Sequence, residues 1–415
     1  MIEPGATLLI TRARLLDTDR MDWGDPCDLL IRDGRIAGTP SGDVRVPAEA
    51  ARIDVGGRRV IPGLIDAHVH VMASDSDYGR LAETSPYLLA ARAGLVLRDM
   101  LLRGFTTVRD AGGADAGLRQ AVAEGAFVGP QLLICDLGLA QTGGQGDFRA
   151  HPRATQGCSV CFGRRSITRL VDGATALRLA VRDMLHEGAD HVKVMASGGI
   201  ASGIPIDRLQ YSDAELAAIV DEASRAGTYV MAHAYKDEAV RRCVRLGITS
   251  IEHASHLDND TCRMLADAGA FIVPTLSVYD AHADPESPTG RLFAEMLEAS
   301  LDSLQRAQAH GVAIGHGSDL TGSAQVLQSR EFVLKARAMP PAEVLRCATT
   351  TNAALLGRAG LLGTLAPGAQ ADLIVLEGDP LEDSAVLADP DRQFRLIAKN
   401  GVIYKNALAD VVRPC

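Results

Sequence analysis

Six polar side chains lie at or just beyond the ends of short apolar runs that are far apart in the sequence. They are four histidines, one lysine and one aspartate: His68, His70, Lys193, His233, His253 and Asp319. Imidazole nitrogens and carboxylate oxygens are ligands that suit Zn²⁺ and related divalent ions. One histidine in such a place is more often a hydrogen-bonded core residue. Six comparable positions in successive runs together predict a metal site.

The spacing within two of these runs supports this prediction. In His68-Val69-His70 the two imidazoles are two residues apart, so on a strand they point to one face and can converge on one point. Lys193 lies in an apolar run, which favours either an ion pair with Asp66 or Asp110 or a place at the metal site. A bare ammonium ~4 Å from a dication would be repelled by about 8 kcal/mol at an effective dielectric of ~20, so the metal-site alternative requires that the lysine lose its charge.

The middle of the chain alternates between apolar runs and helical patterns. Eight runs are predicted to be strands: Leu64–His70, Phe105–Arg109, Gln131–Leu137, His191–Met195, Thr228–His233, Ile248–His253, Phe271–Leu276 and Val312–Ser318. Helices are predicted at Ala174–Glu187, Ser212–Ala226, Glu238–Leu246 and Asp258–Ala268. This rhythm predicts an α/β fold, a (β/α)8 TIM barrel, with the six polar groups at the C-terminal strand ends where barrel enzymes carry their chemistry. A doubly wound sheet is the alternative, but its Gly-x-Gly-x-x-Gly fingerprint is missing.

Both ends of the chain carry short strand patterns. Ala6–Arg14 and Ala51–Val60 near the start, and Ala371–Leu376 near the end, are apolar or alternating. Asp33-Gly34 and Gly56-Gly57 are turn signals between such runs. We therefore predict a small β-sandwich domain from residues 1–62 and 366–415, around a barrel domain at residues 63–365.

Composition excludes several classes of function. The chain has 415 residues, 47% of them hydrophobic, and a formal net charge of −10, so nucleic acid and anionic membranes are not expected partners. No apolar run is long enough to span a membrane, and the N-terminus lacks a secretory signal pattern. Eight cysteines in 415 residues are not a disulfide framework. We expect a cytoplasmic protein.

The motifs around the six residues resemble those of the amidohydrolase superfamily. The similarity lies in Pro62-Gly63-Leu64-Ile65-Asp66-Ala67-His68-Val69-His70, in His191-Val192-Lys193-Val194-Met195-Ala196-Ser197-Gly198-Gly199, and in Leu365–Leu373, which resembles the entry into a C-terminal β-sandwich. The most similar branch is the binuclear, prolidase-like and imidazolonepropionase-like one, which includes Xaa-Pro and Xaa-Arg/Lys dipeptidases and ochratoxin-type amidases. The resemblance implies two divalent metal ions, expected to be Zn²⁺. It assigns His68, His70 and Asp319 to one ion, His233 and His253 to the other, and an N6-carboxylated Lys193 to both.

The same resemblance implies hydrolysis of the amide or peptide C–N bond of a dipeptide or N-acyl amino acid with a free carboxylate. A hydroxide bridging the metals would attack, and Asp319 would take up its proton and return it to the leaving nitrogen. One alternative is an imidazolonepropionase-like hydrolase of a cyclic or non-peptide amide or carbamate. A mononuclear deaminase would not need Lys193, and a catalytically silent oligomeric binding protein would usually lack one of the ligands. The resemblance also favours a homo-oligomer, with an octamer as the expected form.

Other polar residues have weaker patterns. Tyr235, two residues after His233, is similar to a tyrosine that holds the substrate carbonyl or carboxylate in prolidase-like enzymes. Gln145 stands where the family segment Thr-Gly-Gly-His-Gly-Asp has histidine, and Arg149 or Arg153 are candidates to compensate. Cys158-x-x-Cys161 lacks the second pair of a zinc site. His316 is expected to face away from the site, His191 to be a core residue, and His256 to be either a residue next to the metal ligands or a loop residue.

Overall fold

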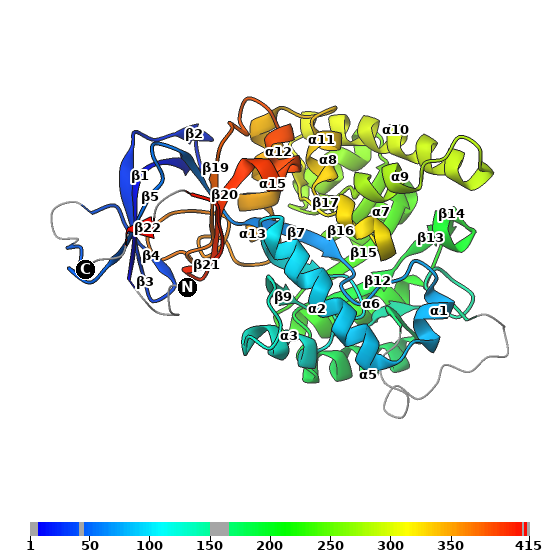
Figure 1. Cartoon of the computed structure of the whole chain (residues 1–415). Helices are drawn as coiled ribbons and strands as arrows, with labels where there is room; N and C mark the ends of the chain where they lie inside the picture. The colour runs from blue at the N-terminus through cyan, green and yellow to red at the C-terminus, as the bar shows by residue number, and fades with distance from the viewer. Residues whose placement is uncertain (1–6, 41–44, 150–165, 409–410, 413–415) are drawn as a thin grey trace. The chain divides into compact units, whose positions relative to one another are not determined.

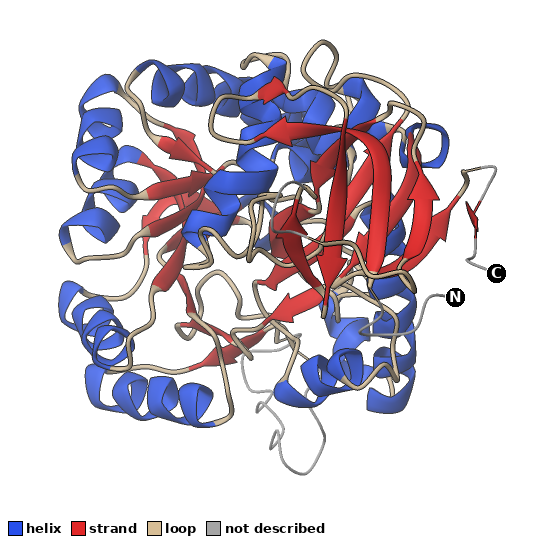
Figure 2. Ribbon diagram, turned by 90° about the vertical axis from the view of Figure 1, so that its left-hand side faces the viewer, coloured by secondary structure: helices blue, strands red, loops and turns tan. Residues whose placement is uncertain are grey.

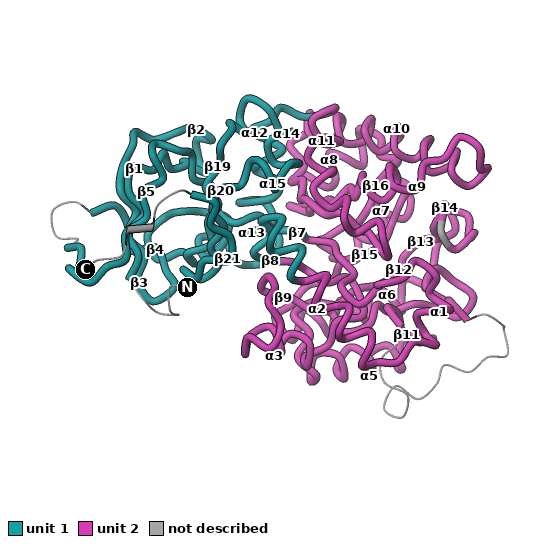
Figure 3. The backbone as a smooth tube through the Cα atoms, in the orientation of Figure 1, with its two compact units in different colours: residues 1–66, 98–107, 339–415 teal, residues 67–97, 108–338 magenta. Residues whose placement is uncertain are grey.

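The computed structural model describes residues 7–40, 45–149, 166–408 and 411–412. The chain forms two compact units, one of residues 1–66, 98–107 and 339–415, the other of residues 67–97 and 108–338 (Figure 3). The order of their elements can be followed in Figure 1. No helix in the described part of the chain is long and apolar enough to cross a bilayer.

The eight predicted strands of the middle are all present. They are β7 (Leu64–Val69), β8 (Phe105–Asp110), β9 (Gln131–Leu133), β12 (Val192–Met195), β15 (Val230–Lys236), β16 (Ser250–His256), β17 (Phe271–Val273) and β18 (Ala313–Ile314). Strands β12, β15, β16, β17 and β18 pair in parallel in that order, and β7, β8 and β9 form a second sheet.

Backbone hydrogen bonds join the edges of the two sheets. Ala67 N donates to His316 O at 2.8 Å, and Asp319 N donates to His68 O at 2.8 Å, which links the end of β18 to β7. At the other edge, Asp190 N, just before β12, donates to Ile134 O, just after β9, at 2.7 Å. The α/β fold with parallel strands is therefore confirmed, and it is consistent with the predicted (β/α)8 barrel.

One predicted strand is divided. The run Gln131–Leu137 forms β9 only as far as Leu133, and a separate strand β10 (Gly138–Ala140) pairs with β12 and with β11 (Thr168–Leu170). Between β9 and β10, Asp136 has a positive φ of 67°, which ends the extended conformation. The apolar character of the run hides this break, because buried turns and buried strands are equally apolar here.

The predicted helices form within one or two residues of their expected bounds. They are α5 (Ala174–His186), α6 (Asp213–Arg225), α7 (Asp237–Arg245) and α8 (Asn259–Asp267). In α6 the Ser212 hydroxyl accepts from Glu215 N while the Glu215 carboxylate accepts from Ser212 N, a capping box that fixes its start. Helix α5 buries Leu177, Val181 and Met184 at helical spacing, and Figure 2 shows helices lying outside the strands.

Strands from both chain ends form one ten-stranded sheet. Its main order is β21 (Val402–Asn406), β20 (Phe394–Lys399), β19 (Leu373–Leu376), β6 (Arg59–Pro62), β1 (Leu8–Asp17), β3 (Cys27–Arg32) and β4 (Arg35–Gly38). Strand β5 (Ala51–Asp54) pairs with β1 in parallel. The predicted turn Asp33-Gly34 joins β3 to β4 with φ of 49° and 71°. Leu8, Ile53 and Leu373 lie in one buried apolar cluster, so the two termini share a core. The sandwich packing itself stays a prediction.

A buried carboxyl group in this sheet makes stability depend on pH. Asp372 is 5% exposed and accepts a hydrogen bond from Asn400 N at 2.7 Å. Burial raises its pKa to about 6. The folded protein therefore prefers the protonated acid, so this contribution to stability is complete below pH ~4 and is lost as the pH rises through about 6.

We expect Asp372→Asn to remove that loss, because the amide oxygen can still accept from Asn400 N. At pH 7.5 the free energy of unfolding should rise by up to ~3 kcal/mol, since one pKa unit corresponds to ~1.4 kcal/mol. Denaturant unfolding between pH 4 and 8 measures the change. The exposed Asp25→Asn is the control, and equal pH slopes for both variants would contradict the assignment.

Candidate metal centre

His68, His70 and Asp319 meet at the C-terminal end of β7. The Nε2 atoms of His68 and His70 both lie 3.3 Å from Asp319 Oδ1, and one ligand atom from each residue falls within 4.8 Å of the others. Both histidines are buried. Because Asp319 N bonds His68 O, the loop after β18 is fixed against β7 and the carboxylate is held beside the two imidazoles. The three donors could hold one divalent ion.

His233 and His253 lie beside this cluster on the neighbouring strands β15 and β16. Their ring centroids are 4.5 Å apart, and the His253 ring is 5.5 Å from that of His68. Burial is the largest cause that lowers the pKa of His233, to about 3, and it also takes the pKa of His253 well below its usual value. Both imidazoles are therefore neutral near pH 7, which is the form that binds metals.

Lys193 is buried on β12 beside these residues, 1% exposed. Burial lowers its pKa, and the carboxylates that oppose this are Glu252 and Asp319 rather than Asp66 or Asp110. Its charge in turn lowers the pKa of His233. Asp110 has a different role, because its carboxylate accepts the backbone N–H groups of Val71, Gly112 and Ala114.

Each of the four histidines has one ring nitrogen in a hydrogen bond with a neighbouring oxygen. The pairs are His68 Nδ1 with Glu252 Oε2 at 2.6 Å, His70 Nδ1 with Gly112 O at 3.0 Å, His253 Nδ1 with Thr275 Oγ1 at 2.8 Å, and His233 Nε2 with Gly198 O at 3.0 Å. A ring nitrogen that faces a backbone carbonyl oxygen carries the proton, so in neutral His70 and His233 the opposite nitrogen is the one that can bind a metal ion. This donor set fits divalent metal ions.

Glu252 is a site residue that the sequence reasoning missed. It is fully buried, and its Oε1 accepts from Arg109 Nη2 at 3.0 Å and from Ser250 Oγ at 2.7 Å, while Oε2 bonds His68. Arg109 is also fully buried and donates to Ala67 O. Burial opposes ionisation of Glu252, but Arg109 and His68 together hold its pKa below the usual value. The carboxylate thus orients a candidate ligand.

The reason it was missed is a local break in strand alternation. Glu252 and His253 are neighbours, so a regular strand would point them to opposite faces. Instead His253 and Ala254 have φ of 76° and 48°, left-handed values that are uncommon for residues with a side chain. Both side chains therefore reach the centre. The one available signal was a carboxylate beside His253 in a strand whose residues are almost all buried.

The two predicted substrate-binding residues occupy different places. The Tyr235 ring is buried and stacks on His253 at 4.9 Å with an interplanar angle of 10°. Burial raises its pKa well above 10, so it is a neutral phenol that can donate a hydrogen bond. Gln145 lies against Gly199, where an added Cβ would be 2.7 Å from Gln145 Oε1. That oxygen is buried and has no hydrogen-bond partner among the described residues.

The remaining candidates lie outside the cluster or outside the described residues. Arg149 pairs with Asp147. His191 stacks on Tyr229 and His316 on Phe332, in keeping with the expectation that neither is a ligand. Arg153, Cys158 and Cys161 lie outside the described residues.

The chain matches a known protein family and is similar to individual enzymes over most of its length. Residues 59–406 match the amidohydrolase family. The chain is 30% identical to ochratoxinase from Aspergillus niger over 402 residues, which covers 91% of this chain and 82% of that enzyme. It is 27% identical to imidazolonepropionase from Deinococcus deserti over 390 residues, covering 87% and 88% of the two chains.

Solved structures show the same similarity in three dimensions. A prolidase complexed with N-methylphosphonate-L-proline has a TM-score of 0.92 and 42% identity, with 97% of this chain and all of that chain covered. A Xaa-Pro dipeptidase with methionine in its active site has a TM-score of 0.84 and 26% identity, with 97% and 100% covered.

Proposed function

This chain belongs to the amidohydrolase family, and on that basis we propose that it uses two divalent metal ions to hydrolyse the amide C–N bond of a dipeptide or N-acyl amino acid. The family and the amide-hydrolysing relatives support a hydrolase that acts on amide bonds. The observation that carries the proposal is the buried cluster of His68, His70 and Asp319 with His233 and His253 beside it.

In the proposed centre, His68, His70 and Asp319 hold one ion, and His233 and His253 hold the other. Lys193 would be carboxylated on Nζ and would supply an anionic ligand to the ions. Carboxylation replaces an ammonium with an anion, which removes the repulsion between a buried cation and two dications. Bound ions of this kind polarise a carbonyl group and lower the pKa of water from about 15.7 toward ~7.

The chain's own groups then move the proton and orient the substrate. Burial opposes ionisation of Asp319, but His68 and His70 hold its pKa well below the usual value, so the carboxylate is ionised and can accept a proton. We propose that Asp319 takes the proton from the attacking water and delivers it to the leaving nitrogen. We propose that the Tyr235 hydroxyl donates to the substrate carbonyl or carboxylate, and Gln145 remains a proposed substrate contact.

A substrate screen tests the proposed reaction. The purified protein is incubated with a library of dipeptides and N-acyl amino acids, and release of amino acid and of ammonia is measured in parallel. Amino acid release without ammonia supports the proposal. Ammonia release would indicate a deaminase, and hydrolysis of cyclic amides alone would favour the imidazolonepropionase-like alternative.

Metal analysis tests the cofactor. We expect about two divalent ions per chain, and we expect exhaustive chelation to lower the rate of amide hydrolysis by more than ~100-fold, with recovery on addition of Zn²⁺. The melting temperature should fall as well, because ions that bind only the folded state stabilise it. A protein with one ion per chain, or full activity after chelation, would contradict the binuclear proposal.

Two further expectations remain proposals. One is a β-sandwich domain of residues 1–62 and 366–415 with a barrel domain at 63–365. The other is a homo-oligomer, with an octamer as the expected form, which light scattering of the purified protein would test.

A further inference from the structure

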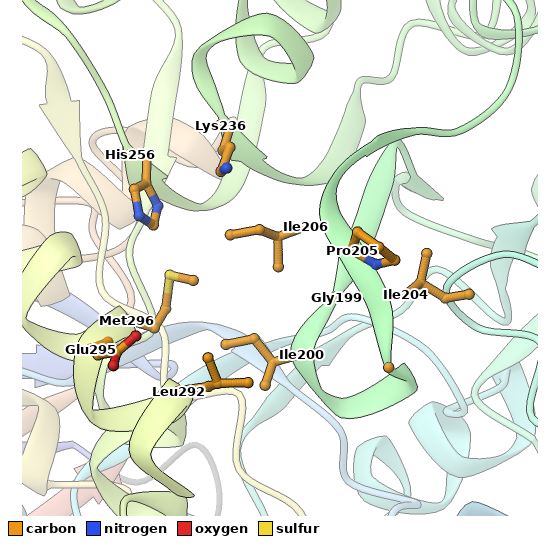
Figure 4. A pocket seen from close by; sticks show the side chains of 11 residues that line it. Gly199, Ile200, Ile204, Pro205, Ile206, Lys236, His256, Leu292, Glu295 and Met296 are labelled. Atoms are coloured by element: carbon orange, nitrogen blue, oxygen red, sulfur yellow. The ribbon is translucent and has the colours of Figure 1, made fainter. Parts of the chain in front are cut away.

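A pocket of about 340 Å³ lies over the ends of β15 and β16 (Figure 4). Its walls come from the hairpin of β13 (Ser197–Gly199) and β14 (Ile204–Leu209) and from helix α10 (Pro288–Ala309). This volume is at the lower end of the ~300–1,000 Å³ typical of small-molecule sites. The pocket is therefore large enough for one bulky substituent of a small molecule.

Most of the pocket's lining is apolar. The apolar side chains are Ile200, Ile204, Pro205, Ile206, Leu292 and Met296, and one carboxylate, Glu295, lies among them. They come from two separate segments, the hairpin and helix α10, which face each other across the pocket in Figure 4. Leu292 is 52% exposed, so part of this apolar wall faces solvent. A hydrophobic substituent that covers this wall would be favoured by the removal of apolar surface from water.

Two hydrogen-bond donors lie on another wall of the pocket. Lys236 and His256 are register partners across β15 and β16, and each follows a candidate metal ligand, His233 or His253, by three residues. Three residues of strand span ~10 Å. Lys236 Nζ is 3.8 Å from Asp207, and both side chains are well exposed, so this ion pair is weak and the ammonium can bind another anion.

The pocket and the metal centre share structural elements. Tyr235, whose ring stacks on His253, immediately precedes Lys236 in the sequence. Gly199 lines the pocket, and the carbonyl of the preceding Gly198 bonds His233 Nε2. A substrate whose scissile carbonyl lies at the histidines would therefore extend along these strand ends toward the pocket.

We propose that this pocket is the subsite for a large apolar substituent of the substrate, aliphatic or aromatic, and that Lys236 binds a carboxylate of the same molecule. The inference rests on the proposed amide hydrolysis and narrows its substrate class. It predicts selection of bulky apolar residues over glycine and alanine, because each missing methylene in such a pocket costs about 10-fold or more in kcat/KM.

Dipeptides of the forms Xaa-Ala and Ala-Xaa, with Xaa as Gly, Ala, Leu or Phe, test the apolar subsite. We expect kcat/KM to rise by at least ~10-fold from Ala to Phe in one of the two series. Leu292→Arg should abolish this rise by placing a charge in the apolar wall, and Met296→Trp should abolish it by filling the pocket. Leu179→Arg, at a leucine that is 59% exposed on α5, is the matched control and should keep the rise. An unchanged profile in both pocket variants overturns the proposal.

A binding measurement separates this inference from the proposed reaction. Titration calorimetry of the zinc-loaded Asp319→Asn protein, in which we expect no turnover, with N-acetyl-phenylalanine and N-acetyl-alanine should show at least ~10-fold tighter binding of the former, and adding Leu292→Arg should remove the difference. Lys236→Met should weaken the binding of N-acetyl-phenylalanine by about 10-fold. It should leave the binding of N-acetyl-phenylalaninamide, which lacks the carboxylate, unchanged. Lys236→Arg should restore the preference for the carboxylate over the amide. Equal binding of the two N-acetyl amino acids overturns the apolar subsite even if dipeptides are hydrolysed. Tight, selective binding without hydrolysis would support the subsite and count against the proposed function.

Discussion

Replacing Asp319 with asparagine should lower kcat for amide hydrolysis by about 10²–10⁴-fold, the range typical of losing a general acid–base group. The amide oxygen can still face His68 Nε2 and His70 Nε2, where Asp319 Oδ1 now lies 3.3 Å from each. An amide, however, cannot take up the proton of the attacking water. We therefore expect much of the metal to remain while turnover is lost. Steady-state rates and metal content of the same sample measure both effects.

The control for this variant is Asp302→Asn, at a carboxylate on α10 whose side chain is 68% exposed. It should leave both rate and metal content unchanged. Full activity of Asp319→Asn would refute the proton-transfer role. Loss of activity together with all bound metal would show that Asp319 acts through metal retention instead.

Glu252→Gln should have the second largest effect, and it acts on stability as well as on the metal centre. The glutamate is the counter-charge of the fully buried Arg109, and breaking a buried ion pair by removing one partner costs about 3–5 kcal/mol. His68 Nδ1 would also lose its carboxylate acceptor, and loss of such a partner typically lowers metal affinity by ~10–100-fold. Denaturant unfolding of the chelated protein measures the first effect, and metal titration measures the second.

Glu298→Gln provides the matched control. Glu298 pairs with Arg337 at 2.8 Å, but both side chains are exposed, so its loss should change the free energy of unfolding by less than ~1 kcal/mol. Adding Arg109→Met to Glu252→Gln should recover part of the stability, because the unpaired charge is then gone. Equal costs for Glu252→Gln and Glu298→Gln would contradict a special role for the buried pair.

Much of the fold could be predicted from the sequence because its signals are local. Helices such as α6 carry both an apolar stripe and a capping box, so their ends are marked twice. Strands β12, β15, β16, β17 and β18 are short apolar runs separated mostly by helices, and their order in the sequence is also their order in the sheet. The break between β9 and β10 was not predicted, because Asp136 and Gly138 are the only turn residues there and they lie within a run that is otherwise apolar.

Only part of the candidate site could be predicted from the sequence. His68 and His70 could be placed on one face because β7 is regular, and Asp319 could be placed beside them because parallel strands end on one rim. Glu252 could not, because its inward position depends on a left-handed backbone at the next residue, which strand alternation does not describe. The pocket beside Lys236 was equally hidden, since a hairpin and a helix distant in sequence build it.

The backbone bonds from His316 and Asp319 to β7 also constrain the order of events during synthesis. Strand β7 leaves the ribosome long before the segment that follows β18. The cluster of His68 and His70 is therefore complete only after Asp319 has been translated. His233 and His253, by contrast, come from adjacent strands and can meet early. Any ion held by His68, His70 and Asp319 is therefore acquired late, after strands β7 to β18 have been made, and a chain truncated before Asp319 should be unable to retain it.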